Sequence, residues 1–278
     1  MAKYDLTGRV VAITGSTGGL GSAVAIELVR KGARLALMDV SEDAARAQAE
    51  QLGGPGVAKG WRVDVRDMES IELAMAEAAE HFGRIDVAFA NAGVESMSPM
   101  EKLDPKVFDR VMDINANGVW RTFRAALPYV RIHKGYLAAT SSMAAFVHSP
   151  LQSPYTASKA AVWAMCDSIR IELRHQSVAV GSYHPTFFHT PMMDNVFSNP
   201  AGMKVWGGNK GGIWRMVSKE EVVQAIVQGM ERRAEMVVIP KANNLVAKAP
   251  GLFRKWVDKI GFKESDIREA ISLAKAEG

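Results

Sequence analysis

Three residues of this chain have side chains and a spacing that suit proton chemistry: Ser142, Tyr155 and Lys159. Tyr155 and Lys159 are four residues apart in a segment that predicts a helix, so their side chains share one helix face. A free tyrosine has a pKa of about 10, and a nearby ammonium group would lower that pKa by favouring the phenolate. Ser142, at the end of a predicted strand, could hydrogen-bond the oxygen of an alcohol or a carbonyl group, and Ser141 is the rival for that role. The three side chains are therefore candidates for general acid–base catalysis.

A second group of residues could hold a dinucleotide. The sequence TGSTGGLG, at 14–21, links the first predicted strand to the first predicted helix. Glycines there allow a tight turn and a close approach of backbone N–H groups to a pyrophosphate at the helix N-terminus. Asp39 closes the second predicted strand, where a carboxylate accepts hydrogen bonds from ribose hydroxyls and repels a 2′-phosphate. We therefore predict NAD, and not NADP, as the cofactor.

The elements that must position these groups alternate between strands and helices. Apolar β-branched runs predict strands at 10–13, 34–38, 60–65, 85–90, 136–140, 178–183 and 236–239. Amphipathic stretches predict helices at 19–31, 41–52, 67–82, 105–130, 154–175 and 219–233. Strands separated by helices of this length are typical of an α/β fold, in which a parallel sheet carries helices on both faces.

Composition excludes several other classes of protein. Hydrophobic residues make up 48% of the 278 residues and charged residues 23%, which excludes disordered, collagen-like and coiled-coil chains. The one cysteine, Cys166, excludes an intrachain disulfide and a cysteine-rich metal site, and it favours a reducing, cytoplasmic location. His184 and His189 lack acidic partners at ligand spacing, so we expect no metal. No signal peptide or membrane-spanning run is found, and no basic cluster large enough for nucleic acid.

Together these motifs resemble the short-chain dehydrogenase/reductase family over about residues 5–240. The resemblance rests on TGSTGGLG, on NAG at 91–93, on Asn115 in DINANG, and on YTASK at 155–159, in the order typical of that family. It implies a single Rossmann-type, doubly wound domain with seven parallel strands in the order 3-2-1-4-5-6-7. It also implies an oxidoreductase that transfers a hydride between a nicotinamide cofactor and a secondary alcohol or ketone. A 3-oxoacyl-thioester reductase is the alternative activity, and an NAD-sensing binding protein is the alternative of another class.

The resemblance also assigns roles to residues. The implied catalytic residues are Ser142, Tyr155, Lys159 and Asn115, the last at the position that holds a water in a proton relay. The implied cofactor contacts are Gly15, Thr17, Gly19, Leu20, Gly21, Asp39, Asp64, Val65, Asn91, Ala92, Gly93, Tyr155, Lys159, Pro185, Phe187 and Thr190. The chain departs from the family at Thr186, where a glycine is usual, and this puts the local backbone in doubt.

An irregular segment at 184–217, rich in methionine and aromatic residues, is expected to cover the substrate as a lid. The expected pocket residues are Met97, Phe188, Met192, Met193 and Trp206, and Met100 could join Met97 on the opposite wall. Such side chains suit a bulky, apolar alcohol or ketone, such as a steroid, a terpenoid, a long acyl chain or an aromatic compound. The alternative is that they pack the lid or a subunit contact.

The remaining length predicts a catalytic domain at 1–240 and a basic amphipathic extension at 241–278. Residues 241–263 hold six lysines and arginines against one aspartate, which exceeds the net charge of +4 of the whole chain. One helical stripe of this tail contains Leu252, Phe253, Trp256, Val257 and Ile260. We expect this stripe to dock on its own subunit or a neighbour, with peripheral membrane contact as the less favoured alternative. The family resemblance implies a homodimer or homotetramer through the helices at 105–130 and 154–175.

Overall fold

The strands form one parallel sheet with the order β3-β2-β1-β4-β5-β6-β7, which confirms the predicted fold. The computed structural model describes residues 3–207 and 216–276. The strands are β1 (Val10–Thr14), β2 (Arg34–Asp39), β3 (Ala58–Arg62), β4 (Val87–Ala90), β5 (Tyr136–Thr140), β6 (Ala179–Pro185) and β7 (Met236–Ile239). The strand order reverses between β1 and β4, and ligands of such sheets bind outside the carboxyl ends of the strands at that point.

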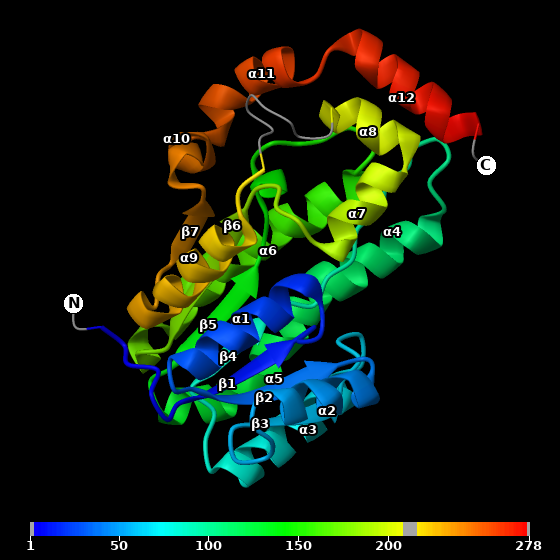
Figure 1. Cartoon of the computed structure of the whole chain (residues 1–278). Coiled ribbons are helices and arrows are strands. Elements are labelled where there is room, and N and C mark those ends of the chain that lie inside the picture. Colours follow the sequence, from blue (N-terminus) through cyan, green and yellow to red (C-terminus); the bar gives the residue numbers. More distant parts are fainter. Residues whose placement is uncertain (1–2, 208–215, 277–278) are drawn as a thin grey trace.

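Helices cover both faces of this sheet (Figure 1). One face is packed by α1 (Gly19–Arg30) and α9 (Lys219–Arg232), whose apolar residues meet those of β1 and β2. The other face is packed by α3 (Met68–Phe82), α5 (Gly118–Ile132) and α6 (Ser153–Leu173). Two further helices are α2 (Glu42–Gln51) and α4 (Pro105–Met112). The two apolar cores fix the sheet and so fix the loops that follow its strands.

Several element boundaries differ from the sequence-based expectation, and three of these differences lie near the predicted site. The predicted helix at 105–130 is interrupted by a π-helical turn, Asp113–Asn117, between α4 and α5. Such a turn holds one extra residue and is common at functional sites. Strand β3 ends at Arg62, so Asp64 and Val65 lie in the loop after it. Strand β6 continues to Pro185.

The segment expected to be irregular is largely helical in its described part. Helices α7 (Pro191–Ser198) and α8 (Pro200–Trp206) follow β6, and residues 208–215 of the expected lid lie outside the described residues. After β7 the chain forms α10 (Asn244–Lys248), α11 (Pro250–Gly261) and α12 (Glu264–Ala276), and α12 runs alongside α8 (Figure 1). Lys204 Nζ lies 3.3 Å from Asp266 Oδ1 and 2.8 Å from Glu269 Oε2.

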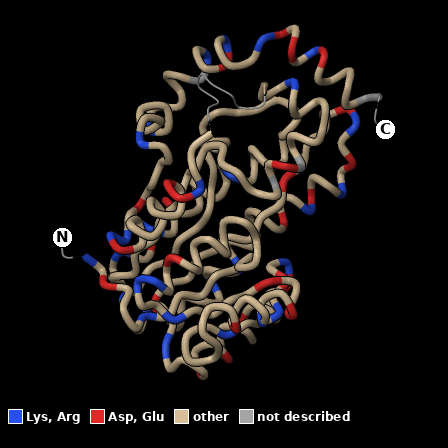
Figure 2. Tube along the Cα trace, in the orientation of Figure 1, with Lys and Arg blue, Asp and Glu red and all other residues tan. Residues whose placement is uncertain are grey.

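The apolar stripe expected on the tail does not dock on its own chain as a unit. Val257 is only 5% exposed, whereas Leu252, Trp256 and Ile260 are 76%, 57% and 46% exposed. Figure 2 shows mainly lysine and arginine residues on α10 and α11, and charges of both signs along α12. Within residues 3–207 and 216–276, no helix combines the length and the apolar character needed to span a membrane.

Candidate active site

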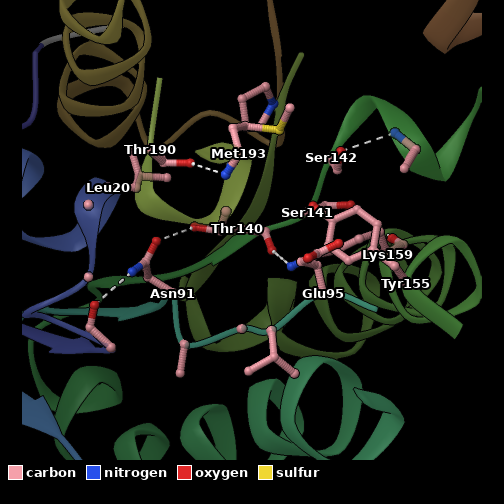
Figure 3. A pocket seen from close by; sticks show the side chains of 18 of the residues that line it. Leu20, Asn91, Glu95, Thr140, Ser141, Ser142, Tyr155, Lys159, Thr190 and Met193 are labelled. Carbon is pink, nitrogen blue, oxygen red and sulfur yellow. Dashed lines mark hydrogen bonds between the residues drawn. The ribbon is translucent and has the colours of Figure 1, made fainter. Parts of the chain in front are cut away.

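A cavity of about 750 Å³ opens at the carboxyl ends of the strands. One end is formed by the glycine turn after β1 and by the ends of β2 and β4, and the other by β5 and α6. Residues 185–206 and the tail helices α10 and α11 complete the wall. The cavity thus joins the predicted dinucleotide site to the predicted chemical site (Figure 3).

At the first end, Asp39 is fixed over the glycine turn. Its Oδ2 accepts hydrogen bonds from the backbone N–H and the hydroxyl of Thr17, at 3.1 and 2.8 Å. Gly15 has a φ of +64°, a conformation that favours glycine, and a Cβ there would come within 2.7 Å of Ala92 Cα. The turn therefore needs a glycine at position 15. The Asp39 carboxylate, from the end of β2, lies beside this turn at the start of α1.

The three central strands are tied together beneath this turn (Figure 3). Asn91 Nδ2 donates to the carbonyl oxygen of Gly15 at 3.1 Å, and Asn91 Oδ1 accepts from the hydroxyl of Thr140 at 3.0 Å.

In the loop after β3, Asp64 pairs with Arg66 at 2.6 Å, and the hydrogen bonds from Arg66 lower the pKa of the Asp64 carboxyl group. Arg66 also lines the cavity, and it is not among the residues expected there from the sequence.

Asn115 clamps the loop after β4 to α6. Its side chain accepts from the N–H of Val94 and donates to the carbonyl oxygen of the same residue, both at 2.8 Å, and it also donates to Ser158 Oγ at 3.1 Å. The π-helical turn places this fully buried amide between the two elements. Among the predicted catalytic residues, Asn115 alone does not line the cavity.

Tyr155 and Lys159 project from the first turns of α6 into the cavity (Figure 3). Burial raises the pKa of Tyr155, the charge of Glu95 adds to that rise, and a hydrogen bond with the Ser142 side chain opposes it. Lys159 Nζ donates to the carbonyl oxygen of Thr140 at 2.9 Å, and burial lowers the pKa of Lys159 to about 8. The expectation that Lys159 lowers the pKa of Tyr155 is therefore not met, because burial dominates both groups.

The two candidate serines have different surroundings. Ser141 Oγ is buried and donates to the carbonyl oxygen of Lys159 at 2.8 Å, which makes it a structural link between β5 and α6. Ser142 is less buried, and its Oγ accepts from the N–H of Ala144 at 3.1 Å and hydrogen-bonds Tyr155. The hydroxyl that faces the tyrosine is therefore that of Ser142.

A buried histidine supports Ser142 from behind. His184 Nδ1 donates to the carbonyl oxygen of Ser142 at 3.2 Å, and His184 Nε2 accepts from the hydroxyl of Ser182 at 2.8 Å. Burial lowers the pKa of His184 to about 4, so the ring is neutral near pH 7. Among the described residues, no group of three or more histidine, cysteine or acidic side chains could hold a metal ion.

Most of the predicted contact residues line the cavity. Of the predicted cofactor contacts, Gly21 alone does not, because it lies inside α1 against Asn91. Thr186 has no positive φ, so the doubt about the local backbone is removed. The cavity, the glycine turn at a helix N-terminus and the carboxylate of Asp39 together fit a dinucleotide without a 2′-phosphate.

The predicted substrate residues are only partly brought together. Phe188, Met193 and Trp206 line the cavity. Met97 does not line it and instead packs with the apolar cluster around α8, while Met100 is exposed. The side chain of Met192 lies outside the described residues.

Sequence reasoning missed many other lining residues, among them Glu95, Gln152, Val196, Asn243, Val246, Trp256 and Val257. Glu95 could have been found, because only Val94 separates it from the NAG motif at 91–93. The tail residues carried no such indication, because they reach the cavity only through the path of the chain after β7.

The family model described as short chain dehydrogenase matches residues 9–201. D-threitol dehydrogenase of Mycolicibacterium smegmatis is 32% identical over 210 residues, which cover 75% of this chain and 77% of the relative. (-)-trans-Carveol dehydrogenase of Rhodococcus erythropolis is 32% identical over 213 residues, covering 70% and 76%. An uncharacterized NAD-dependent oxidoreductase of Mycobacterium tuberculosis is 32% identical over 206 residues, covering 68% and 75%.

Among solved structures, a short-chain type dehydrogenase/reductase from Mycobacterium marinum superposes with a TM-score of 0.76 at 26% identity. The match covers 85% of this chain and 95% of that one. With the family model spanning well over half of the sequence, the assignment follows: the chain belongs to the short-chain dehydrogenase/reductase family and is an oxidoreductase.

Proposed function

We propose that this chain is an NAD-dependent dehydrogenase of secondary alcohols and, in reverse, a reductase of ketones. The observation that carries the proposal is one continuous cavity with Asp39 over the glycine turn at one end and Ser142, Tyr155 and Lys159 at the other. The first end suits the adenosine half of a dinucleotide. The second end suits an alcohol whose hydroxyl proton must be removed.

NAD is the cofactor in this proposal, and the name of the Mycobacterium tuberculosis relative supports it. Asp39 would accept hydrogen bonds from the adenosine ribose, and Asp64 and Val65, which line the same end of the cavity, would contact the adenine. Lys159 would reach the second ribose, and Thr190 would contact the carboxamide. Bound NAD supplies the acceptor for the hydride that leaves the carbinol carbon.

The side chains at the second end divide the proton chemistry. In oxidation, ionised Tyr155 takes the hydroxyl proton of the substrate, and in reduction it returns that proton to the carbonyl oxygen. Ser142 donates a hydrogen bond to the same oxygen and stabilises its developing negative charge. Lys159, held by the carbonyl oxygen of Thr140, keeps a positive charge close by. Asn115 acts as a positioning residue, because its side chain fixes Val94 and Ser158 around the lysine.

The wall beyond the reacting groups favours an apolar substrate body. Phe188, Met193, Val196, Trp206 and Val257 line it, and methionine and aromatic side chains adapt to bulky apolar groups. The relatives are named for one polyol, threitol, and one terpenoid alcohol, carveol. The apolar lining supports a bulky apolar substrate and not a small polyol. Such substrates include a steroid, a terpenoid, an acyl compound or an aromatic alcohol.

The test is a turnover screen with the purified chain, in which NADH absorbance is followed with NAD and a panel of alcohols. We expect kcat/KM for bulky apolar alcohols to exceed that for small polyols and sugars. A Tyr155→Phe variant should lose turnover by a factor of about 10² to 10⁴ while still binding NADH. Binding of NADH without turnover of any alcohol or ketone would favour an NAD-sensing protein, and activity confined to 3-oxoacyl thioesters would favour the reductase alternative.

We also propose that residues 1–240 form the catalytic domain and that the tail, 241–278, docks on protein. The ion pairs of Lys204 with Asp266 and Glu269 support docking on the same chain.

Self-association of the chain through α4, α5 and α6 is supported by exposed apolar side chains, among them Phe108, Trp120 and Ile171. Light scattering of the full chain and of residues 1–245, with and without anionic vesicles, tests both points. Lipid binding by the intact chain alone would contradict docking on protein.

A further inference from the structure

We propose that Glu95 binds a second hydroxyl group of the substrate, next to the reacting carbinol. The preferred substrates are then vicinal diols, or the matching α-hydroxy ketones, on an otherwise apolar skeleton. This inference rests on the proposed function, since it concerns the same cavity and the same reaction.

The backbone that carries Glu95 is firmly held. Val94, its neighbour, exchanges two hydrogen bonds of 2.8 Å with the buried side chain of Asn115. The loop after β4 therefore holds Glu95 at a fixed point, and its side chain lines the cavity together with Ser142 and Tyr155 (Figure 3). Its negative charge is close enough to the phenol to raise the pKa of Tyr155.

Only part of the hydrogen-bonding capacity of the Glu95 carboxylate is used within the protein. It is hydrogen-bonded by Gln152, which is itself buried and whose Oε1 accepts from the hydroxyl of Ser149 at 2.9 Å. That acceptor role leaves the NH₂ group of Gln152 for Glu95. Glu95 Oε2 is buried and has no hydrogen-bond partner, although a buried acceptor without a donor costs free energy.

Glu95 does not help to activate the tyrosine. A negative charge beside a phenol favours its neutral form, which works against removal of the substrate proton. Burial raises the pKa of the Glu95 carboxyl group, and the hydrogen bond from Gln152 opposes that rise. In its ionised form the carboxylate has lone pairs and no proton to give, so what it then binds must be a hydrogen-bond donor. A second hydroxyl on the carbon next to the carbinol supplies that donor in the cavity that Glu95 and Tyr155 both line.

The test compares matched alcohols with and without this hydroxyl: cyclohexanol, indan-1-ol and 1-tetralol against their trans-1,2-diols, with saturating NAD. The measured quantity is the ratio of kcat/KM for the diol to that for the monoalcohol. We expect this ratio to fall about tenfold to hundredfold in Glu95→Leu, and less in Glu95→Gln, whose amide oxygen still accepts a hydrogen bond. Glu72→Gln, an exposed carboxylate on α3, is the control that should leave the ratio unchanged.

A second measurement separates this role from a merely structural one. With a monoalcohol as substrate, the apparent pKa in the pH profile of kcat/KM should move down in both Glu95 variants, because a charge that raises the pKa of Tyr155 is gone. A diol-to-monoalcohol ratio that stays unchanged in both variants would overturn the inference, as would a wild-type preference for 1,2-amino alcohols over diols. Wild-type protein that oxidises no member of the panel would instead contradict the proposed function.

Discussion

Lys159 donates its hydrogen bond to the carbonyl oxygen of Thr140, at 2.9 Å, while the centre of the Tyr155 ring lies 5.6 Å from the same nitrogen. The lysine is therefore held by the end of β5 and not by the phenol. Burial raises the pKa of Tyr155 and lowers that of Lys159 to about 8. Both pKa values are thus set mainly by burial. Because Tyr155 is the group that takes the substrate proton, we expect its ionisation to govern how the rate rises with pH.

We expect kcat/KM for alcohol oxidation to rise through neutral pH into the alkaline range. A base must be deprotonated to take the substrate proton, and the ionised fraction of a phenol with a raised pKa grows about tenfold per pH unit below that pKa. Initial rates between pH 6 and 10, with the stability of the protein checked at each pH, measure this profile. A profile that is already flat at pH 7 would show that Tyr155 ionises at a lower pH than its burial implies.

The cofactor preference should depend on Asp39. Replacement by serine removes the carboxylate that is fixed over the glycine turn by Thr17, and with it the repulsion of a 2′-phosphate. We expect the ratio of kcat/KM with NAD to that with NADP to fall by about tenfold or more. Asp43→Ser, at an exposed position on α2, is the control and should leave the ratio unchanged. A higher kcat/KM with NADP in the wild type would refute the assignment of NAD.

Stability should fall in acid because of His184. The folded state keeps this ring neutral down to a pKa of about 4, through burial, whereas an unfolded histidine takes up a proton near pH 6.5. Protons then bind preferentially to the unfolded chain as the pH drops from about 6.5 to about 4, so the free energy of unfolding decreases over that range.

Urea unfolding of wild type and of a His184→Gln variant at pH 7 and pH 5 measures this effect. The loss of stability between the two pH values should be about 2 kcal/mol smaller in His184→Gln than in the wild type. His148→Gln, at an exposed position, should behave like the wild type. Equal losses in all three proteins would show that His184 is not the group that titrates.

Residues at fixed helical spacing or at strand ends could be assigned from the sequence. Tyr155 and Lys159 face the same cavity because α6 is regular, and Asp39 reaches the glycine turn because neighbouring parallel strands end at the same edge. The strand order followed from the family resemblance. These parts of the site depend only on the spacing of residues within a helix and on the order of the strands in the sheet.

The rest depended on packing between distant segments. Spacing shows that Tyr155 and Lys159 are neighbours but not how deeply they are buried, and burial raises the pKa of Tyr155 where spacing alone predicts a lower one. The position of Met97 after β4 predicts a pocket residue, yet Met97 packs in the apolar cluster around α8. Trp256 and Val257 reach the cavity from a tail whose path across the lid is decided by contacts such as that of Trp206 with Phe262, with ring centres 5.6 Å apart.

That path makes the tail part of the substrate wall, which leads to a last prediction. Trp256→Ala should raise the KM for a bulky apolar alcohol by about threefold to tenfold, because apolar surface that would be buried against the substrate is removed. The smaller 2-propanol should show little change, since it would not extend from Tyr155 to α11. Leu252→Ala, also on α11 but 76% exposed and outside the cavity wall, is the matched control. If Trp256→Ala and Leu252→Ala gave the same KM for the bulky alcohol, α11 would not contact the substrate, and the apolar specificity would have to come from α7 and α8 alone.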